Sequence, residues 1–257
     1  MRIGVCTGLS GMTASADGLA LFESTVGELL CPAEEEAAFE HRLVAARAAT
    51  LPVEAVNCLF PGSLRNVGSD VDPAALDEWM TTTCRRAARV GVEMIVFGSG
   101  GSRMLKDGFD RTRASEQIVE NLKRYGPIAA ARGVTIVLEP LNTGDCNFIN
   151  SVDEGAELVR AADHPNIRLL VDTYHMAKDD DPAESIRRAG ELIAHAHCAE
   201  GASRGPLGTT GEDQRPYFRA LKDIGYEGRI SIECTWDDYA RDLPAGVAEL
   251  RRQWEEA

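Results

Sequence analysis

Short apolar runs alternate with longer amphipathic stretches along the whole chain. The apolar runs are brief and rich in Val, Ile, Leu and Phe, a pattern that favours buried β-strands. The run LALFESTVGELL is the least distinct, because it could also continue a helix. The predicted strands span residues 3–7, 21–26, 53–60, 93–98, 135–140, 167–173, 193–198 and 229–234.

The stretches between these strands carry the signals with which helices begin and end. Asp72 precedes Pro73, as an N-cap precedes proline at the first helical position. Ser151 and Asp181 each stand three residues before a glutamate, the spacing of a capping box. Glycines stand where the helices should end, just before the next strand, at Gly91, Gly133, Gly190 and Gly225.

Eight strand–helix units with no linker between them predict one closed barrel. Parallel strands need helical crossovers, so we expect a single (β/α)₈ TIM barrel in one domain that spans residues 1–257. An open, doubly wound sheet is the structural alternative. It has less support because no GxGxxG follows the first strand, and GSGGSR at 98–103 lacks that spacing.

Composition and charge narrow the functional classes. The 41 acidic and 27 basic residues give a net charge of −14, which repels nucleic acid, and an aromatic content of 6% disfavours base stacking. The seven cysteines form no CxxC pair and are typical of reduced thiols in a cytoplasmic protein. Neither a leader nor a long apolar segment is visible, so we expect no export and no membrane insertion.

Four polar residues stand at or near the ends of four successive predicted strands. Three are acids, Glu139, Asp172 and Glu233, and the fourth is His197. Each alone could be an ordinary loop residue, but strand ends that meet at one mouth of a barrel favour a shared site. Crowded carboxylates repel, and a divalent cation removes the conflict. Three oxygen donors and an imidazole suit Mn²⁺, our first choice, or Mg²⁺ or Co²⁺.

Further polar residues lie beside these four. His195 and His197 point the same way along one strand, so we assign His197 to the metal and His195 to the core, with the reverse as the alternative. His175 and Asp145 lie just past two strand ends, where His175 either binds a substrate oxygen or is a surface histidine. Arg204, in GASRGPLG, either offers its guanidinium to a substrate or is solvated. Pocket-shaping residues are also expected near Glu23, Asn57, Phe60 and Ser99.

Five segments, in this order along the chain, resemble the xylose-isomerase-like TIM-barrel superfamily of sugar isomerases and epimerases. Within it they are most similar to the ketose 3-epimerase and hydroxypyruvate isomerase branch. The segments are FGSGG (97–101), LEPLN (138–142), VDTYHM (171–176), HAHCAEGASRGPLG (195–208) and GYEGRISIEC (225–234).

The resemblance implies roles for individual residues. Glu139, Asp172, His197 and Glu233 would bind the metal, and Glu139 and Glu233 would also form the catalytic acid–base pair. Substrate binding would fall to three others, Asp145, His175 and Arg204. Two features depart from the epimerase pattern. Asp145 is one methylene shorter than the family's glutamate, and the spacing from His197 to Arg204 is one residue longer. Family habit further implies a homodimer or homotetramer.

These parts predict α-proton abstraction from a ketose or related keto-sugar, through a metal-stabilised enediolate. Reprotonation on the opposite face would make the protein an epimerase, and reprotonation on the adjacent carbon an aldose–ketose isomerase. A lyase or dehydratase acting on a keto-inositol or 3-keto-glycoside through the same enolate is the main alternative. An apurinic endonuclease has less support, because strands 53–60 and 93–98 lack the extra histidines of its three-metal site. A non-catalytic sugar-binding protein would have little need for four converging ligands.

Overall fold

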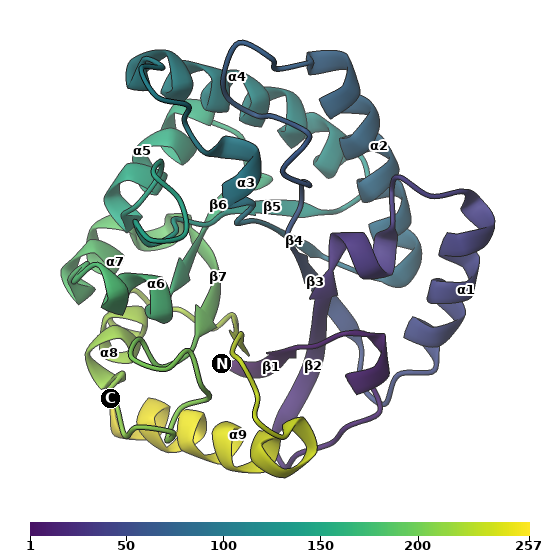
Figure 1. Ribbon diagram of the computed structural model, residues 1–257. Coiled ribbons are helices and arrows are strands. Elements are labelled where there is room, and N and C mark those ends of the chain that lie inside the picture. The colour runs from purple at the N-terminus through teal and green to yellow at the C-terminus, as the bar shows by residue number, and fades with distance from the viewer.

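The computed structural model describes all residues, 1–257, and forms a closed barrel of eight parallel strands (Figure 1). Strands pair in sequence order and β1 closes the barrel against β8, so the predicted (β/α)₈ barrel is confirmed. The strands are β1 (Arg2–Cys6), β2 (Leu19–Thr25), β3 (Val53–Asn57), β4 (Met94–Phe97), β5 (Thr135–Leu138), β6 (Ile167–Asp172), β7 (Ile193–Cys198) and β8 (Arg229–Ile232).

Helices surround the barrel (Figure 1). None of them is both long enough and apolar enough to cross a membrane. The α-helices are α1 (Glu36–Arg47), α2 (Pro73–Val90), α3 (Gly100–Arg103), α4 (Arg111–Ala130), α5 (Val152–Ala162), α6 (Thr173–Lys178), α7 (Ala183–Ala189), α8 (Arg215–Asp223) and α9 (Tyr239–Glu256). Two 3₁₀ turns, η1 (Leu9–Gly11) and η3 (Gly190–Leu192), and one π-helical turn, η2 (Val26–Leu30), complete the set.

Two strand predictions differ from the structure in an informative way. The ambiguous run LALFESTVGELL is a strand up to Thr25 and a π-helical turn from Val26, so both interpretations hold for part of it. The third strand ends at Asn57 rather than at residue 60. It ends there because Cys58 has a φ of 55°, which leaves the extended region.

Most of the predicted helix signals are confirmed. Ser151 caps α5 by accepting a hydrogen bond from the Glu154 backbone N–H, and all four glycines have positive φ. The capping box at 181–184 is wrong. Pro182 is the N-cap of α7 and makes no side-chain cap, because the Asp181 carboxylate accepts from the Val152 backbone N–H instead. Asp181 therefore joins the start of α5 to the segment that leads into α7.

Asp72 caps α2, the long helix that covers the barrel between β3 and β4. Its carboxylate accepts from the backbone N–H groups of Ala74 and Ala75, at 3.0 and 3.2 Å. We expect Asp72→Ala to lower the free energy of unfolding by about 1 kcal/mol, because both N–H groups then lose the carboxylate and have only water to bind. Urea unfolding measures the change, with Asp107→Ala, an exposed site, as the control. No loss beyond that of the control would contradict the cap assignment.

The apolar core has two parts. The larger part lies between the strands and the helices, and a small separate cluster contains Val96, Val137 and Leu170. Alternate residues of a strand share a face, so Glu139 lies on the face of Val137, and Asp172 on that of Leu170. The small cluster is therefore an apolar floor beneath the carboxyl ends of β5 and β6.

Candidate active site

The barrel brings the four predicted strand-end residues together. Asp172 is the last residue of β6, His197 lies in β7, and Glu139 and Glu233 directly follow β5 and β8. One ligand atom from each lies within 4.8 Å of the others. His197 Nδ1 is 3.4 Å from Glu139 Oε1 and 3.8 Å from Glu233 Oε2. We call these four residues the strand-end ring.

The donor atoms of the strand-end ring fit a cation. Glu139 Oε1, Asp172 Oδ2 and His197 Nδ1 are buried and have no hydrogen-bond partner. Buried lone pairs without a partner are costly, and convergent ones are what a metal ion would satisfy. Three carboxylates and one imidazole nitrogen also match the oxygen-rich donor sets of Mn²⁺ and Mg²⁺. The residues present therefore suit a divalent cation.

Charge crowding shifts the pKa values of the ring in opposite directions. Burial, followed by the charge of Glu139, raises the pKa of Asp172 to about 8, and burial also raises the pKa of Glu233. Burial opposes ionisation of Glu139 as well, but the adjacent His197 holds its pKa below the ordinary value. For His197, burial favours the neutral form, yet the nearby Glu23 and Glu233 carboxylates raise its pKa well above normal. The metal-free ring therefore retains protons at neutral pH.

Metal binding should release protons from this ring. Because Asp172 is protonated at neutral pH without metal, Mn²⁺ must displace that proton, and we expect its affinity to rise by up to about tenfold per pH unit as pH approaches 8. The same raised pKa also makes the metal-free fold less stable as pH rises from the ordinary pKa of an aspartate towards 8. In that pH range the native state still holds the Asp172 proton, whereas the unfolded chain has lost it. Calorimetric titration in buffers of different ionisation enthalpy counts the protons released. An affinity independent of pH would contradict this prediction.

A cavity of about 240 Å³ opens beside the strand-end ring. All three predicted substrate-binding residues, Asp145, His175 and Arg204, line it together with Glu139 and Glu233. The longer spacing before Arg204 therefore does not keep it from the site. Pocket-shaping residues were expected near four positions. Asn57 and Cys58 line this cavity, as do Gly98 and Gly100 on either side of Ser99, whereas Glu23, Phe60 and Ser99 themselves do not.

Hydrogen bonds set the orientation of His175. The Asn142 backbone N–H donates to His175 Nδ1 at 3.2 Å, which makes that nitrogen an acceptor and leaves the proton of the neutral ring on Nε2. Nε2 lies 3.7 Å from Asp172 Oδ2. Asn142 also donates from Nδ2 to Asp145, at 2.8 Å. Asn142, which the sequence reasoning did not single out, thus links two of the predicted substrate-binding residues.

Arg204 is held in the cavity wall by charge and by an aromatic ring. Its guanidinium lies 3.3 Å from Glu233 Oε2 and 3.5 Å from Asp145 Oδ2. Its Cζ also stacks 4.5 Å from the ring centroid of Tyr174. The backbone of Arg204 has a φ of 50°, so the loop holds this residue in a conformation that non-glycine residues rarely adopt.

Two buried residues near the ring make contacts that the sequence did not predict. Glu23, on β2, is fully buried and accepts from Nε2 of both His195 and His197, at 2.9 Å each. His195 is accordingly a buried, hydrogen-bonded core histidine, as expected. Arg103 is also fully buried and donates to the carbonyl oxygens of Phe97 and Glu139, which ties the ends of β4 and β5 together.

Gly98 gives Glu139 its space. A Cβ at residue 98 would lie 1.6 Å from Glu139 Oε2, so any side chain there must displace that carboxylate. We expect Gly98→Ala to weaken Mn²⁺ binding by at least about tenfold. That is the lower end of the affinity loss typical when the surroundings of a metal ligand are altered. Titration calorimetry measures the loss. Gly27→Ala is the control, because nothing lies within 4 Å of its added methyl group. Equal affinity in the two variants would contradict the predicted role of Glu139.

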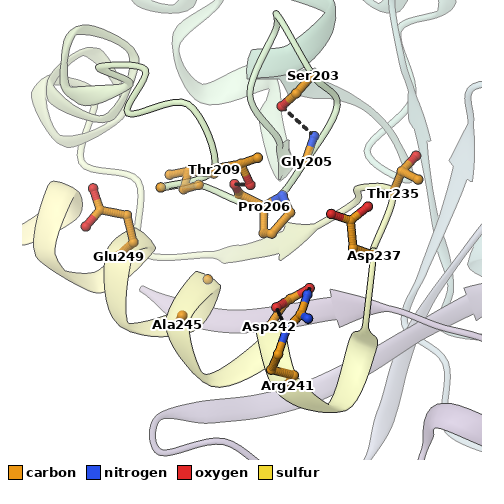
Figure 2. Close-up of a pocket in the computed structure, with 13 residues that line it drawn as sticks. Ser203, Gly205, Pro206, Thr209, Thr235, Asp237, Arg241, Asp242, Ala245 and Glu249 are labelled. Carbon is orange, nitrogen blue, oxygen red and sulfur yellow. Dashed lines mark hydrogen bonds and ion pairs between the residues drawn. The ribbon is translucent and has the colours of Figure 1, made fainter.

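A second, larger cavity of about 590 Å³ lies between the loop that follows β7 and helix α9 (Figure 2). Asp237, Asp242 and Glu249 line it, as do Ser203 and Gly205, the neighbours of Arg204. No residue of the strand-end ring reaches it. Size alone therefore does not locate the candidate chemistry, which is at the smaller cavity.

The chain is similar to curated sugar epimerases and isomerases. It is 35% identical over 122 residues to the D-psicose 3-epimerase of Ruminiclostridium cellulolyticum, covering 46% of this chain and 40% of that protein. It is 33% identical over 128 residues to the 2-oxo-tetronate isomerase of Cupriavidus necator, covering 48% and 49%. The chain thus spans less than half the length of these curated relatives in the matched regions.

A solved structure extends the similarity to the whole fold. The D-allulose 3-epimerase from Methylomonas sp. superposes with a TM-score of 0.82 at 22% identity, covering 99% of this chain and 98% of the other. A family model described as "Xylose isomerase-like TIM barrel" matches residues 14–256. The resemblance inferred from the motifs is confirmed, and the chain belongs to the xylose isomerase-like TIM barrel family.

Proposed function

We propose that the protein is a divalent-metal-dependent epimerase or aldose–ketose isomerase that acts on a ketose or related keto-sugar. The observation that carries this proposal is the strand-end ring, with its three unpartnered buried donor atoms. The ring opens on a polar cavity lined by Asp145, His175 and Arg204. The printed activities of the curated relatives, among them D-psicose 3-epimerase and 2-oxo-tetronate isomerase, lend further support.

Glu139, Asp172, His197 and Glu233 would hold the cation, with Mn²⁺ preferred and Mg²⁺ or Co²⁺ as alternatives. When bound, such an ion polarises a carbonyl group and stabilises the negative charge that develops when the α-proton leaves. Without the ion, burial and then the neighbouring Glu139 carboxylate raise the pKa of Asp172, and burial raises that of Glu233. A cation among the ligand atoms would favour the ionised forms, which supports metal dependence.

Glu139 and Glu233 would move the proton. They follow β5 and β8, which are separated by β6 and β7 in the barrel, so they approach the cavity from different sides. One carboxylate removes the proton from the α-carbon, and the other donates one to the opposite face in an epimerase. Asp145, His175 and Arg204 would bind and orient the substrate hydroxyl groups from the rim.

The charges around the cavity favour an uncharged sugar over a sugar phosphate. Arg204 is the only Lys or Arg in the lining, and it is already paired with Asp145 and Glu233. Phosphate recognition normally uses several free cationic donors. Hydroxyl groups, in contrast, can both donate to the carboxylates and accept from Arg204 and His175.

Other properties complete the proposal. We propose a single-domain cytoplasmic enzyme that works as a homodimer or homotetramer and binds neither nucleic acid nor membrane. The net charge of −14 supports the absence of nucleic-acid binding.

Product analysis tests the proposed function. We would incubate the Mn²⁺-loaded protein with uncharged ketopentoses and ketohexoses, their phosphates, keto-acids and keto-inositols, and identify the products by chromatography and NMR. We expect an epimer or an aldose from an uncharged ketose. An eliminated product, with a new alkene or a released group, would replace this function by the lyase alternative. Conversion of the phosphates alone would contradict the charge argument.

A further inference from the structure

Glu23 joins two histidines across the inside of the barrel. It lies on β2, and both histidines lie on β7, with β8 and β1 between these strands in the closed order (Figure 1). Each oxygen of its carboxylate accepts one hydrogen bond, Oε2 from Nε2 of His195 and Oε1 from Nε2 of His197. All three side chains have no exposed surface. A carboxylate in such a place is stable only if it is fully paired, as this one is.

The pairing fixes which nitrogen of His197 faces the strand-end ring. An ionised carboxylate only accepts hydrogen bonds, so the proton must be on Nε2. The other ring nitrogen, Nδ1, then points towards Glu139 and Glu233, at 3.4 and 3.8 Å. It is also one of the buried atoms with no partner of its own. Once a metal has displaced the protons of the strand-end ring, the Nδ1 lone pair faces the carboxylates of Glu139, Asp172 and Glu233.

His195 makes this arrangement sensitive to the exact chemistry of residue 23. The two imidazoles meet edge to face, with ring centroids 5.0 Å apart, so they pack against each other as well as against Glu23. A carboxylate satisfies two N–H donors at once. A glutamine of the same size offers one oxygen and one NH₂ group, so it can accept from only one of the two histidines.

We infer that Glu23 is a positioning residue for the metal site, which holds His197 through Nε2–H so that Nδ1 is presented to the cation. The inference rests on the proposed metal-dependent function. It extends that function to Glu23, which contacts His197 but does not line the cavity. Outer partners of this kind orient ligands, and their loss typically weakens metal binding by about 10–100-fold.

The test measures Mn²⁺ affinity by titration calorimetry and histidine protonation by long-range ¹H–¹⁵N NMR on the diamagnetic Zn²⁺-loaded protein. In the wild-type chain we expect two buried Nε2–H protons, from His195 and His197, that exchange slowly with solvent. In Glu23→Gln we expect one of them at most, and an Mn²⁺ affinity about 10–100-fold weaker. Glu54→Gln is the control, since Glu54 is a largely buried carboxylate of β3 paired with Arg2 and Arg229, away from the ring. It should leave Mn²⁺ affinity unchanged.

A second-site variant separates positioning from packing. In Glu23→Gln/His195→Gln, the carboxamide oxygen of residue 195 can accept the NH₂ group of residue 23, which frees the oxygen of residue 23 for His197. We therefore expect most of the lost Mn²⁺ affinity to return, whereas a packing defect would become worse with a second buried substitution.

The outcomes are distinct. Unchanged Mn²⁺ affinity in Glu23→Gln, or a wild-type Zn²⁺ complex in which Nε2 of His197 carries no proton, would overturn the inference while the proposed function stands. The wild-type spectrum decides the question even if the variants fold poorly. Absence of Mn²⁺ binding by the wild-type chain would overturn the proposed function, and this inference with it.

Discussion

Glu233→Gln is expected to lower turnover by about 10²–10⁴-fold at saturating Mn²⁺, the usual contribution of a general acid or base. The variant keeps the shape of the side chain and the hydrogen bond from Asn57 Nδ2, which is 2.7 Å long in the wild-type structure. It removes the group that can take up and return a proton, together with one charge of the strand-end ring and the ion pair with Arg204, so turnover is compared at saturating Mn²⁺. Steady-state kinetics on the substrate found by the product panel measures the loss.

The control for this variant is Glu227→Gln, an exposed carboxylate in the turn before β8. It changes the net charge by the same amount and should leave turnover unchanged. Melting temperatures and Mn²⁺ content establish that both variants are folded and loaded. Full turnover by folded, Mn²⁺-loaded Glu233→Gln would remove Glu233 from the proposed acid–base pair.

Removal of the metal is expected to abolish turnover and to lower the melting temperature. A ligand held at 100 times its dissociation constant stabilises a native state by about 2.7 kcal/mol, which is roughly 5–10 °C for a chain of this size. The physical reason is that only the native state brings Glu139, Asp172 and Glu233 together as ligands, so the cation binds the folded chain and not the unfolded one. Thermal unfolding with EDTA and then with added Mn²⁺ measures the shift, and turnover should return with the metal.

Asp172→Asn serves as the matched control for chelation. It removes one of the three charges, so its melting temperature should respond less to Mn²⁺ than that of the wild-type chain. A wild-type protein whose activity and melting temperature are the same with EDTA and with Mn²⁺ would contradict the metal site.

The architecture follows from the sequence because its signals are local. Alternating strand and helix patterns, the Asp72–Pro73 start and the four helix-ending glycines each act within a few residues, and all of them appear in the structure. The errors occur where a distant partner decides. Asp181 has the spacing of a capping box, yet its carboxylate bonds to Val152 at the start of another helix. The third strand ends early because Cys58 has a positive φ, which a cysteine in the sequence gives no reason to expect.

The candidate site divides in the same way. Strand-end position was enough to predict that Glu139, Asp172, His197 and Glu233 meet, because the barrel brings strand ends together. The supporting residues could not be assigned because their partners lie far away in the sequence. Glu23 is 172 residues from His195. One signal was available for it, since a single acid within the apolar run LALFESTV must be paired when that strand is buried.

Deuterium incorporation at the carbon next to the carbonyl group tests metal-dependent α-proton abstraction most directly. We would incubate uncharged ketoses with the Mn²⁺-loaded protein in D₂O and follow the label by NMR, with an EDTA-treated sample alongside. Metal-dependent α-proton abstraction predicts Mn²⁺-dependent label at C3 of the ketose for an epimerase. For an isomerase it predicts label at C2 of the aldose product and at C1 of the recovered ketose, and neither enzyme should give label with EDTA. Product formation without any solvent label at these carbons, or equal labelling in the EDTA sample, would contradict metal-dependent α-proton abstraction.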